Sequence, residues 1–385
     1  MHSCWVEINR SALRHNMRAV RHLVGDHTGV IAVVKANAYG HGAVETARLF
    51  AEEGAQMLAV TRLDEALPLR AAGLETPIFL LAPALHGECD EVVAQGLTAC
   101  ISDLRDARNL SDAAVRQKRT VRVQLKINTG MGRLGVEPET AIETAKQIQE
   151  LPNLELTGAY THFASAGERD TGLVLAQYGR FQPLVQLISR ATGLSPQNFH
   201  CANSAALLRF PSMRLSCVRP GTILYGQFPS PMADEAAQGQ GLKLRDGFAV
   251  KARIIAIKNL RIGQTLGYGP EWKATRPTRI ATLAIGWADG LSMEPHARTA
   301  SYAEVKRAAQ LTAKRAAQWY GVRGDDASRK VRLNGESASI IGRIAMQQCS
   351  IDITHLPDAQ TGDAVTLSMR RLSAGAHLPR VYVED

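Results

Sequence analysis

Short apolar segments alternate with segments of helical periodicity from about residue 10 to residue 226. Short apolar runs bounded by turn-forming residues are typical of buried parallel strands. The segments predicted as strands are 30–34, 57–60, 78–81, 98–101, 121–127, 154–160, 195–200 and 215–224. Eight strands separated by helices predict a (β/α)8 TIM-like barrel, in which functional side chains lie at the carboxyl ends of the strands.

The periodicity changes after Phe228. Residues 229–241 contain Pro, Gly and Gln and are interpreted as a linker or loop. Beyond them, the segments with the pattern of strands are 248–260, 278–285, 338–341 and 348–353. Asn334-Gly335 is the strongest hairpin signal in the chain.

These patterns predict two domains. The first is the barrel, over residues 10–228. The second is a mainly β C-terminal domain, over residues 1–9 and 241–385, which we expect to include the N-terminal strand. A basic amphipathic helix near residues 301–320 is expected as an insertion in the β domain, because apolar residues recur there at helical spacing.

The composition is that of an ordinary globular protein, with 45% hydrophobic and 21% charged residues. We find no apolar run long enough to span a membrane, and the N-terminus lacks the pattern of a signal peptide. The 6 cysteines are scattered without metal-ligand spacing, which favours reduced thiols and predicts no metal site. A cytoplasmic protein is the simplest interpretation.

The net charge of +9 is unevenly distributed. Residues 293–332 contain nine Lys and Arg against four Asp and Glu, a surplus of five. A basic surface could bind nucleic acid or acidic lipids, but we find no recognition motif and no aromatic residues between the charges. We therefore expect neither a nucleic-acid nor a membrane partner, and a solvated basic helix is the simpler explanation.

Lys35 ends an apolar run and is followed at once by small and turn-forming residues. Burying a lysine is costly unless the amine is paired or reacts, and desolvation lowers its pKa toward the nucleophilic form. Such lysines form Schiff bases with aldehydes, including pyridoxal phosphate. The alternative is a lysine whose ammonium group reaches solvent at the end of a strand.

Further polar residues lie at or just after predicted strand ends: Lys126, His162, Asn203 and Arg219. Arg133 lies in a glycine-rich turn that follows Lys126. Hydroxyl and backbone N–H groups near Ser204 and Gly221 are of the type that binds phosphate. Taken singly, each is more commonly a glycine turn, a core histidine or a capping serine.

Together with Lys35, these motifs resemble those of the fold-type III pyridoxal-phosphate enzymes, and among them the alanine racemase family. The segments that carry the resemblance are 34–42, 125–135, 218–226, 266–269 and 284–290. The first of these resembles the family's cofactor-lysine motif. The resemblance extends over about residues 5–292 and 331–385.

The resemblance implies a pyridoxal 5'-phosphate enzyme that interconverts L-alanine and D-alanine and so supplies D-alanine for peptidoglycan. Lys35 would hold the cofactor and act as one acid/base, and Tyr268 of the partner subunit in a homodimer as the other. Two groups are needed because inversion removes a proton from one face and delivers one to the opposite face. A tyrosine of pKa about 10 is ionised in roughly one molecule in a thousand at pH 7. Cationic neighbours, expected to be Arg219 and His162, must therefore favour the phenolate.

The resemblance also implies how the cofactor and substrate are held. Arg219 would face the pyridine nitrogen, which stays unprotonated because a guanidinium only donates, and His162 would orient Arg219. The phosphate would be bound by Tyr39, Ser204, Gly221 and Thr222. Arg133 would contact the phenolic oxygen and the substrate carboxylate, and the Met346 backbone N–H would donate to the same carboxylate. Lys126 matches a position that is often carbamylated, where the carbamate would neutralise and hold Arg133.

The chain departs from the family pattern at several positions. Asn128 and Gln347 each stand where the family commonly has Asp, and Trp287 stands where it usually has Tyr. The C-terminal domain also contains extra sequence of roughly 30 residues, largely the basic helix. These departures leave the substrate open between alanine, serine and another small amino acid.

Two other functions remain as alternatives. A decarboxylase of the same fold type would need its own arrangement of cysteine and aspartate in the C-terminal domain. A non-catalytic protein that binds pyridoxal phosphate would resemble the barrel alone. The β domain that carries Tyr268 argues against the second alternative.

Overall fold

A computed structural model of the protein describes residues 1–269, 271–293 and 329–384. The chain forms two compact units. The first unit comprises Asn9–Gly247 and Val383–Asp385, and the second comprises Met1–Ile8 and Phe248–Tyr382. The basic helix predicted near residues 301–320 lies outside the described residues.

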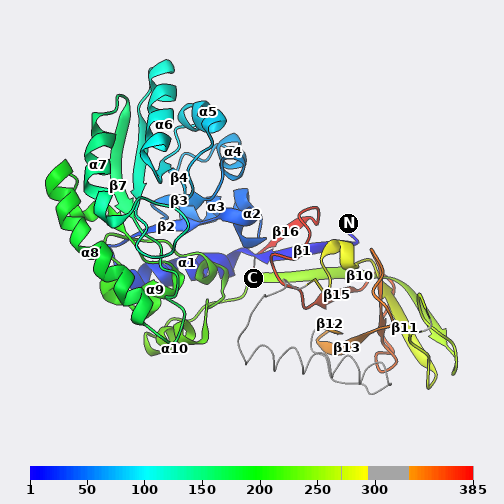
Figure 1. Ribbon diagram of the computed structural model, residues 1–385. Helices are drawn as coiled ribbons and strands as arrows, with labels where there is room; N and C mark the ends of the chain where they lie inside the picture. The colour runs from blue at the N-terminus through cyan, green and yellow to red at the C-terminus, as the bar shows by residue number, and fades with distance from the viewer. Residues whose placement is uncertain (270, 294–328, 385) are drawn as a thin grey trace. The chain divides into compact units, whose positions relative to one another are not determined.

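Eight parallel strands form the centre of the first unit (Figure 1). They are β2 (Gly29–Val33), β3 (Met57–Val60), β4 (Ile78–Leu80), β5 (Ala99–Ile101), β6 (Val121–Lys126), β7 (Leu154–Tyr160), β8 (Phe199–His200) and β9 (Cys217–Val218). Two four-stranded sheets have the orders β4-β3-β2-β9 and β5-β6-β7-β8. Parallel bridges between Phe79 and Thr98 and between Asn203 and Arg219 join the two sheets. These pairings close the ring and confirm the predicted barrel.

Helices lie around the strands, as Figure 1 shows for α4 to α8. The helices are α1 (Arg10–Val24), α2 (Lys35–Tyr39), α3 (Ala43–Glu52), α4 (Leu63–Ala71), α5 (Cys89–Ala94), α6 (Leu104–Arg116), α7 (Ala141–Glu150), α8 (Gly172–Thr192), α9 (Ser204–Arg209) and α10 (Pro231–Gly239). Short 3-10 helices are η1 (His86–Glu88), η2 (Pro138–Thr140), η3 (Pro196–Asn198), η4 (Pro211–Met213), η5 (Thr222–Tyr225) and η6 (Trp287–Asp289).

The barrel strands follow the apolar pattern of the sequence closely, except for the last two strands, β8 and β9. β3 and β7 have the predicted bounds, whereas β8 and β9 are much shorter than the segments 195–200 and 215–224. In each of these segments a proline precedes or begins a 3-10 helix, and a proline cannot donate to a strand ladder. The apolar character of these segments therefore comes partly from buried turns, such as the one that holds Ile223 and Leu224.

The prediction that residues 229–241 form a linker or loop is wrong, because α10 occupies most of that stretch. The Ser230 Oγ accepts a hydrogen bond from the Ala233 backbone N–H at 3.2 Å, and Pro231 occupies the first helical position. Proline is favoured there because its missing N–H would have no partner within the helix. Ala233 and Ala237, four residues apart, form the buried face.

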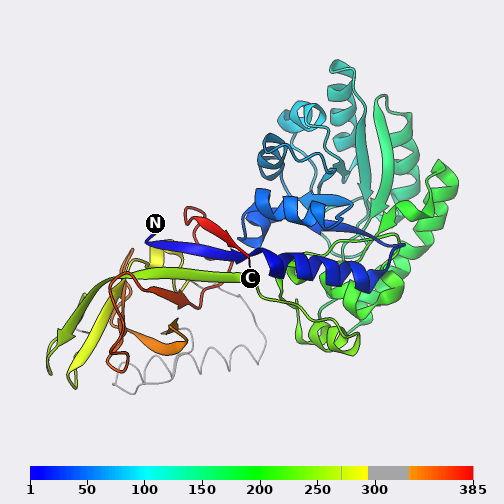
Figure 2. The same cartoon turned by 180° about the vertical axis from the view of Figure 1, so that it is seen from behind.

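The second unit is built on a sheet with the order β11-β14-β13-β12-β15-β10-β1-β16. Its strands are β1 (Cys4–Asn9), β10 (Phe248–Leu260), β11 (Thr278–Leu283), β12 (Lys330–Leu333), β13 (Glu336–Ile341), β14 (Cys349–Asp352), β15 (Ala364–Leu367) and β16 (Arg380–Val383). The N-terminal strand β1 runs antiparallel to β10, as predicted (Figure 2). The strand β10 also pairs with β11 beyond a bulge at Ile254, which closes the strands from β10 to β15 into a ring.

The predicted hairpin at Asn334-Gly335 is confirmed. Leu333 pairs with Glu336, and the two turn residues have φ angles of 50° and 87°. Two positive φ angles are the signature of a type I′ turn, which suits the twist of the flanking strands. The short strands β12, β15 and β16 were not predicted from the sequence.

Candidate active site

A cavity of about 460 Å³ lies at the carboxyl ends of the barrel strands. The site residues predicted within the barrel all line it: Lys35, Tyr39, Lys126, Arg133, His162, Ser204, Arg219, Gly221 and Thr222. These residues come from widely separated parts of the sequence. The barrel brings them together because the ends of parallel strands meet at one mouth.

Lys35 follows β2 directly and is half-buried. The strand end before it is held by two backbone hydrogen bonds, from Val33 to Pro220 O at 3.0 Å and from Val34 to Ala59 O at 2.8 Å. Burial lowers the pKa of the Lys35 amine, and the nearby Arg133 guanidinium lowers it further. A larger fraction of the amine is therefore neutral and nucleophilic than for a lysine in water.

Arg219 is the most deeply buried cation of the cavity, with 3% of its surface exposed. Its Nη1 donates to the His200 Nδ1. Its Nη2 donates to the Thr161 carbonyl at 2.7 Å and to the Cys201 carbonyl at 3.2 Å. Burial lowers the pKa of the guanidinium, but an arginine remains charged in proteins. Arg219 therefore presents a fixed positive charge at the cavity wall.

His200 and Gln124 hold Arg219 in place, and we did not predict a role for either. The His200 Nδ1 accepts from Arg219, so its Nε2 carries the proton and donates to the Gln124 Oε1 at 2.7 Å. The His200 ring also stacks on Tyr160, with centroids 5.2 Å apart. Gln124 lies two residues before Lys126, so both side chains point to the same side of β6. That spacing was the signal available in the sequence.

His162 differs from expectation. Burial and, to a smaller extent, the Arg219 charge lower its pKa to about 3, so the imidazole is neutral near pH 7. Its Nδ1 lies 3.5 Å from the Arg219 Nη2 and can only accept from a guanidinium. The expectation that His162 adds positive charge to the site is therefore wrong, whereas its contact with Arg219 is present.

Hydroxyl groups and a backbone N–H group lie close together at one end of the cavity. Ser204 is the first residue of α9, and the Asn203 side chain caps this helix. The Ser204 Oγ accepts a hydrogen bond from the Gly221 backbone N–H at 2.8 Å. The Tyr39 hydroxyl lies against Gly221, where a side chain would collide with it. Hydroxyls and backbone N–H groups in this arrangement suit a phosphate group.

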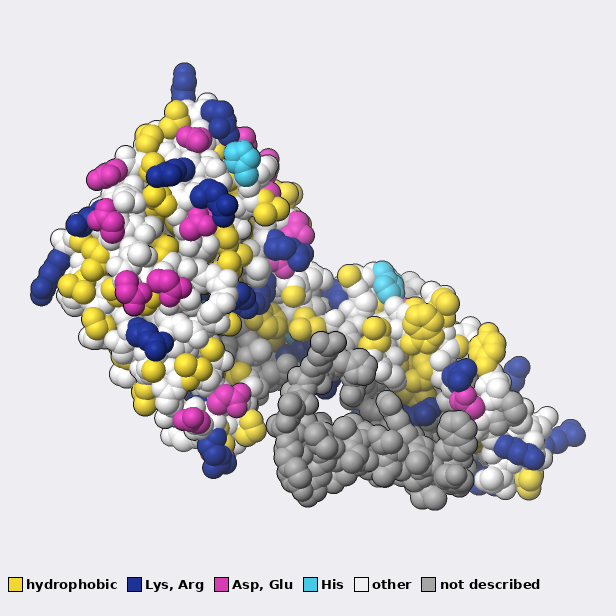
Figure 3. All heavy atoms as spheres, in the orientation of Figure 1, with side chains coloured by type: hydrophobic (Ala, Val, Ile, Leu, Met, Phe, Trp, Pro, Cys, Tyr) yellow, Lys and Arg dark blue, Asp and Glu magenta, His cyan; other side chains and the backbone are white. Residues whose placement is uncertain are grey.

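Cations dominate the cavity. Lys35, Lys126, Arg133 and Arg219 line it, and none of the lining side chains identified in the described parts of the chain is a carboxylate. On the visible face of the barrel unit, by contrast, basic and acidic side chains are interspersed (Figure 3). Positive groups without acidic partners form a site for anions. The phosphate of pyridoxal phosphate and a substrate carboxylate fit this charge pattern.

Lys126 is 5% exposed, and its Nζ lies 3.4 Å from the Leu81 carbonyl and 5.4 Å from the centre of the Tyr160 ring. Burial lowers the pKa of its amine, and the charges of Arg133 and Arg219 lower it further. Lys126 is thus a buried amine held by a single carbonyl. Its neutral form is favoured relative to that of an ordinary lysine.

Arg133 lies on a glycine-rich turn organised by Asn128. The Asn128 Oδ1 accepts from the Gly132 backbone N–H at 2.9 Å, and its Nδ2 donates to the Glu137 Oε1 at 2.8 Å. Gly135 has a φ of 116°, and a side chain there would meet the backbone of Asn128. An asparagine serves both hydrogen bonds, whereas an ionised aspartate could serve only the first.

The other two predicted site residues, Tyr268 and Met346, belong to the second unit. Tyr268 lies between Gly267 and Gly269, which have φ angles of 79° and 54°. The loop that carries it is closed by an antiparallel bridge between Thr265 and Lys273. Tyr268 is 71% exposed and Met346 is 57% exposed.

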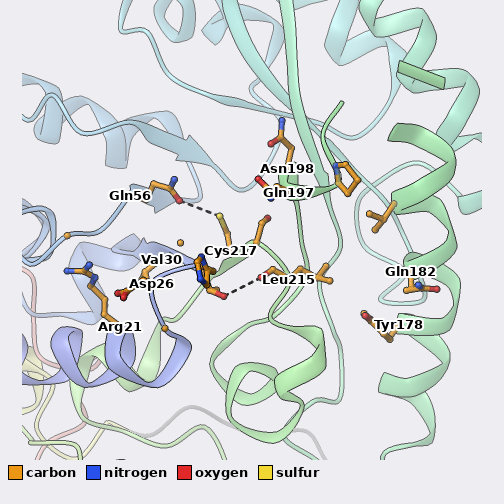
Figure 4. A pocket seen from close by; sticks show the side chains of 18 of the residues that line it. Arg21, Asp26, Val30, Gln56, Tyr178, Gln182, Gln197, Asn198, Leu215 and Cys217 are labelled. Atoms are coloured by element: carbon orange, nitrogen blue, oxygen red, sulfur yellow. Dashed lines mark hydrogen bonds between the residues drawn. The ribbon is translucent and has the colours of Figure 1, made fainter. Parts of the chain in front are cut away.

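A larger cavity, of about 800 Å³, lies at the opposite ends of the barrel strands. Its walls include Arg21 of α1, Gln182 of α8, Gln56 just before β3, and Cys217, the first residue of β9 (Figure 4). The Cys217 Sγ lies 3.5 Å from the Gln56 Oε1, and burial raises the pKa of the thiol. None of the site residues predicted from the sequence lines this cavity.

In the described part of the chain, no group of His, Cys, Asp and Glu is placed to hold a metal ion. Nor does any helix in residues 1–269, 271–293 and 329–384 combine the length and apolarity needed to cross a membrane.

A barrel with an amine at the end of its first strand, a cavity lined by cations and hydroxyl groups, and an attached β domain is the architecture of a pyridoxal-phosphate enzyme of fold type III. Residues 8–229 match the family model described as "Alanine racemase, N-terminal domain", and residues 248–378 match "Alanine racemase, C-terminal domain". The chain belongs to the alanine racemase family. It is an amino-acid racemase, an isomerase, and depends on pyridoxal 5'-phosphate.

Individual relatives agree with this assignment. An alanine racemase of Desulforamulus reducens is 35% identical over 376 residues, which cover 97% of this chain and 91% of the relative. One of Desulfovibrio desulfuricans is 36% identical over 399 residues, covering 99% and 98%. A solved structure of alanine racemase from Clostridium difficile 630 superposes with a TM-score of 0.85 at 28% identity, covering 100% of this chain and 97% of that chain.

Proposed function

We propose that the enzyme interconverts L-alanine and D-alanine, with Lys35 and Tyr268 as acid/base groups on opposite faces of the substrate. The observation that carries the proposal is the Lys35 amine, whose pKa is lowered, in a cavity of cations and phosphate-binding groups. The names of the relatives support alanine as the substrate. The D-alanine formed would enter cell-wall peptidoglycan.

Different residues of the cavity would bind different parts of the cofactor and the substrate. When bound, pyridoxal phosphate supplies the electron withdrawal that makes the substrate Cα–H acidic. Its phosphate would be bound by Tyr39, Ser204, Gly221 and Thr222. Arg219 would donate to the pyridine nitrogen, with His200 holding the guanidinium in position. Arg133 and the Met346 backbone N–H would bind the substrate carboxylate.

Each acid/base group needs surroundings that favour its reactive form. Burial and the Arg133 charge favour the neutral Lys35 amine, as described above. The fixed charges of Arg133 and Arg219 would favour the Tyr268 phenolate, because they attract a negative oxygen. His162 would assist only as a neutral hydrogen-bond donor through its Nε2, because its pKa of about 3 leaves it uncharged.

We further propose that the enzyme is a homodimer in which Tyr268 and Met346 of each subunit complete the partner's cavity. The support is the exposure of Tyr268 at a loop tip in a unit separate from the barrel. Sedimentation and activity measured at matched concentrations test this. A monomer with full turnover would contradict the dimer.

We also propose that Lys126 is carbamylated. A neutral amine adds to carbon dioxide and releases one proton, and the lowered pKa of Lys126 favours that form. The carbamate would supply the negative charge that the lining otherwise lacks and would hold Arg133. Electron density of crystals grown with bicarbonate tests this, and an unmodified Lys126 amine there would refute it.

Incubation with single enantiomers, followed by chiral chromatography, tests the reaction itself. Alanine should racemise fastest in a panel that includes serine and other small amino acids. Tyr268→Phe should keep the visible absorbance of the bound cofactor and lose turnover of the L-isomer most. Near-normal rates in both directions for this variant would contradict the role of Tyr268.

A racemase of serine or of several small amino acids is the second candidate. Asn128, Trp287 and Gln347, which differ from the usual family residues, favour it. Faster turnover of serine than of alanine in the same panel would decide for this candidate.

We place the enzyme in the cytoplasm. The support is that all 6 cysteines lie within the described residues and are free thiols. Unpaired thiols suit a reducing compartment. Fractionation of cells that express the full chain tests the location.

A further inference from the structure

The turn that follows Lys35 has a conformation that L-amino acids rarely adopt. Ala36, Asn37, Ala38 and Tyr39 have φ angles of 53°, 53°, 53° and 52°, so they form a left-handed turn without a glycine. Each such residue costs free energy because its Cβ crowds the backbone. A turn of this kind persists only where its surroundings hold it.

Glu65 is one of the groups that hold it. The Glu65 Oε1 accepts a hydrogen bond of 2.6 Å from the Ala36 backbone N–H, at the start of the turn. Its Oε2 accepts from the Thr61 and Arg62 backbone N–H groups at 2.8 and 3.2 Å. One carboxylate therefore joins the loop after β2, next to Lys35, to the loop after β3.

Asp106 shows what capping alone requires. Asp106 is the third residue of α6, as Glu65 is the third residue of α4. The Asp106 Oδ2 accepts from the Ser102 and Asp103 backbone N–H groups at 3.0 and 3.2 Å. A shorter acidic side chain thus caps an equivalent loop of the same barrel. The bond from Glu65 to the Ala36 N–H is additional to capping and needs the extra methylene.

Electrostatics point to the same pair. The Glu65 charge raises the pKa of Lys35, although burial and Arg133, the larger causes, lower it. Glu65 does not line the cavity itself. It therefore acts on the amine through the backbone turn and through its charge, without touching the substrate space.

We propose that Glu65 is a positioning residue for Lys35, holding the left-handed turn so that the amine stays at the reacting position in the cavity. The inference rests on the proposed role of Lys35 and adds a residue outside the cavity to that site. Displacement of a reacting group by about 1 Å can cost roughly a hundredfold in rate.

The decisive variant is Glu65→Asp, which converts the loop to the arrangement that Asp106 already shows. It should keep the capping bonds and the melting temperature, and lose the bond to Ala36. In the holoenzyme, kcat for alanine should fall roughly ten- to a hundredfold with little change in KM. The reverse swap at the matched site, Asp106→Glu, should leave kcat within about twofold.

A charge variant tests the electrostatic part of the proposal, and it also leaves only one of the two acceptor oxygens that Glu65 uses. Glu65→Gln removes the charge that raises the pKa of Lys35, so that pKa falls further. The midpoint pH for capture of pyridoxal phosphate by the apoprotein should move down. Asp106→Asn should lower the melting temperature by about as much as Glu65→Gln does. It should leave the midpoint pH of cofactor capture unchanged.

The outcomes distinguish this inference from the proposed function. If the unmodified enzyme captures the cofactor and racemises alanine, but Glu65→Asp and Glu65→Gln behave like the Asp106 variants, the positioning role is wrong. If the unmodified enzyme fails to bind the cofactor through Lys35, the proposed function itself is wrong. A kcat loss confined to the Glu65 variants supports the inference.

Discussion

The two mouths of the barrel differ in size and in chemistry. The cavity at the amino ends of the strands, about 800 Å³, is larger than the cavity of about 460 Å³ at the carboxyl ends. The larger one is lined mainly by amides, hydroxyls and exposed polar groups. The smaller one gathers Lys35, Lys126, Arg133 and Arg219. The proposed active site is therefore in the smaller of the two cavities.

Burial changes the properties of the groups in the smaller cavity. Groups there have lost water, so that the pKa values of Lys35 and His162 fall and the charge of Arg219 acts through a medium of low dielectric. At the other mouth, burial instead raises the pKa of the Cys217 thiol, which makes it less nucleophilic. Burial therefore makes the Lys35 amine more nucleophilic and the Cys217 thiol less nucleophilic.

The largest expected difference between the mouths comes from Lys35→Ala. Turnover should fall by roughly a thousandfold or more, because both the covalent attachment of the cofactor and one acid/base group are lost. The visible absorbance of bound cofactor should disappear. Gln182→Ala, at the other mouth, is the control and should change neither quantity. Equal losses in the two variants would break the comparison.

A smaller loss of turnover is expected from His200→Ala, because the Arg219 guanidinium then loses the ring nitrogen that accepts a hydrogen bond from its Nη1. The kcat should fall by roughly ten- to a hundredfold, which corresponds to about 1.4–2.8 kcal/mol. His200→Asn, which keeps an acceptor near the same place, should recover part of the loss. His27→Ala, at the larger cavity, should have no effect on steady-state kinetics.

Arg133→Gln should shift the pH dependence of cofactor capture by the apoprotein. It removes a positive charge that lowers the pKa of Lys35, so that pKa rises toward its ordinary value, although burial, the larger cause, remains. At a given pH less amine is neutral, and the midpoint of cofactor capture by the apoprotein should move to higher pH. Arg21→Gln, at the opposite mouth, should leave the midpoint in place. A downward shift for Arg133→Gln would contradict the electrostatic argument.

The smallest effect is expected from Asn128→Asp, at the turn that carries Arg133. Two carboxylates would then face each other where Asn128 now donates to Glu137 at 2.8 Å. Their repulsion raises a carboxyl pKa in the folded state, so the stability deficit grows as pH rises through the carboxyl range and shrinks as pH falls. We expect about 1 kcal/mol at pH 7 in urea unfolding. A deficit that is independent of pH would point to another cause.

Most of the predicted site residues of the barrel lie at strand ends and glycine turns, which local sequence shows, and their roles came from the family resemblance. Lys35 and Lys126 each follow or end an apolar strand, and Gly135 marks a turn. His200 and Gln124 were missed because their role depends on Arg219, which lies elsewhere in the chain. The neutrality of His162 was missed for a related reason, since burial and neighbouring charges set its pKa.

The sequence by itself determined the barrel and the β domain, because hydrophobic periodicity and turn residues act over a few neighbouring positions. It also singled out Lys35, through the resemblance of residues 34–42 to a family motif. The tertiary structure decided which polar groups share one cavity and which of them are charged. It also decided that Glu65 reaches the backbone of the turn after Lys35. Desolvation and hydrogen bonds between distant segments exist only once the ring of strands has closed.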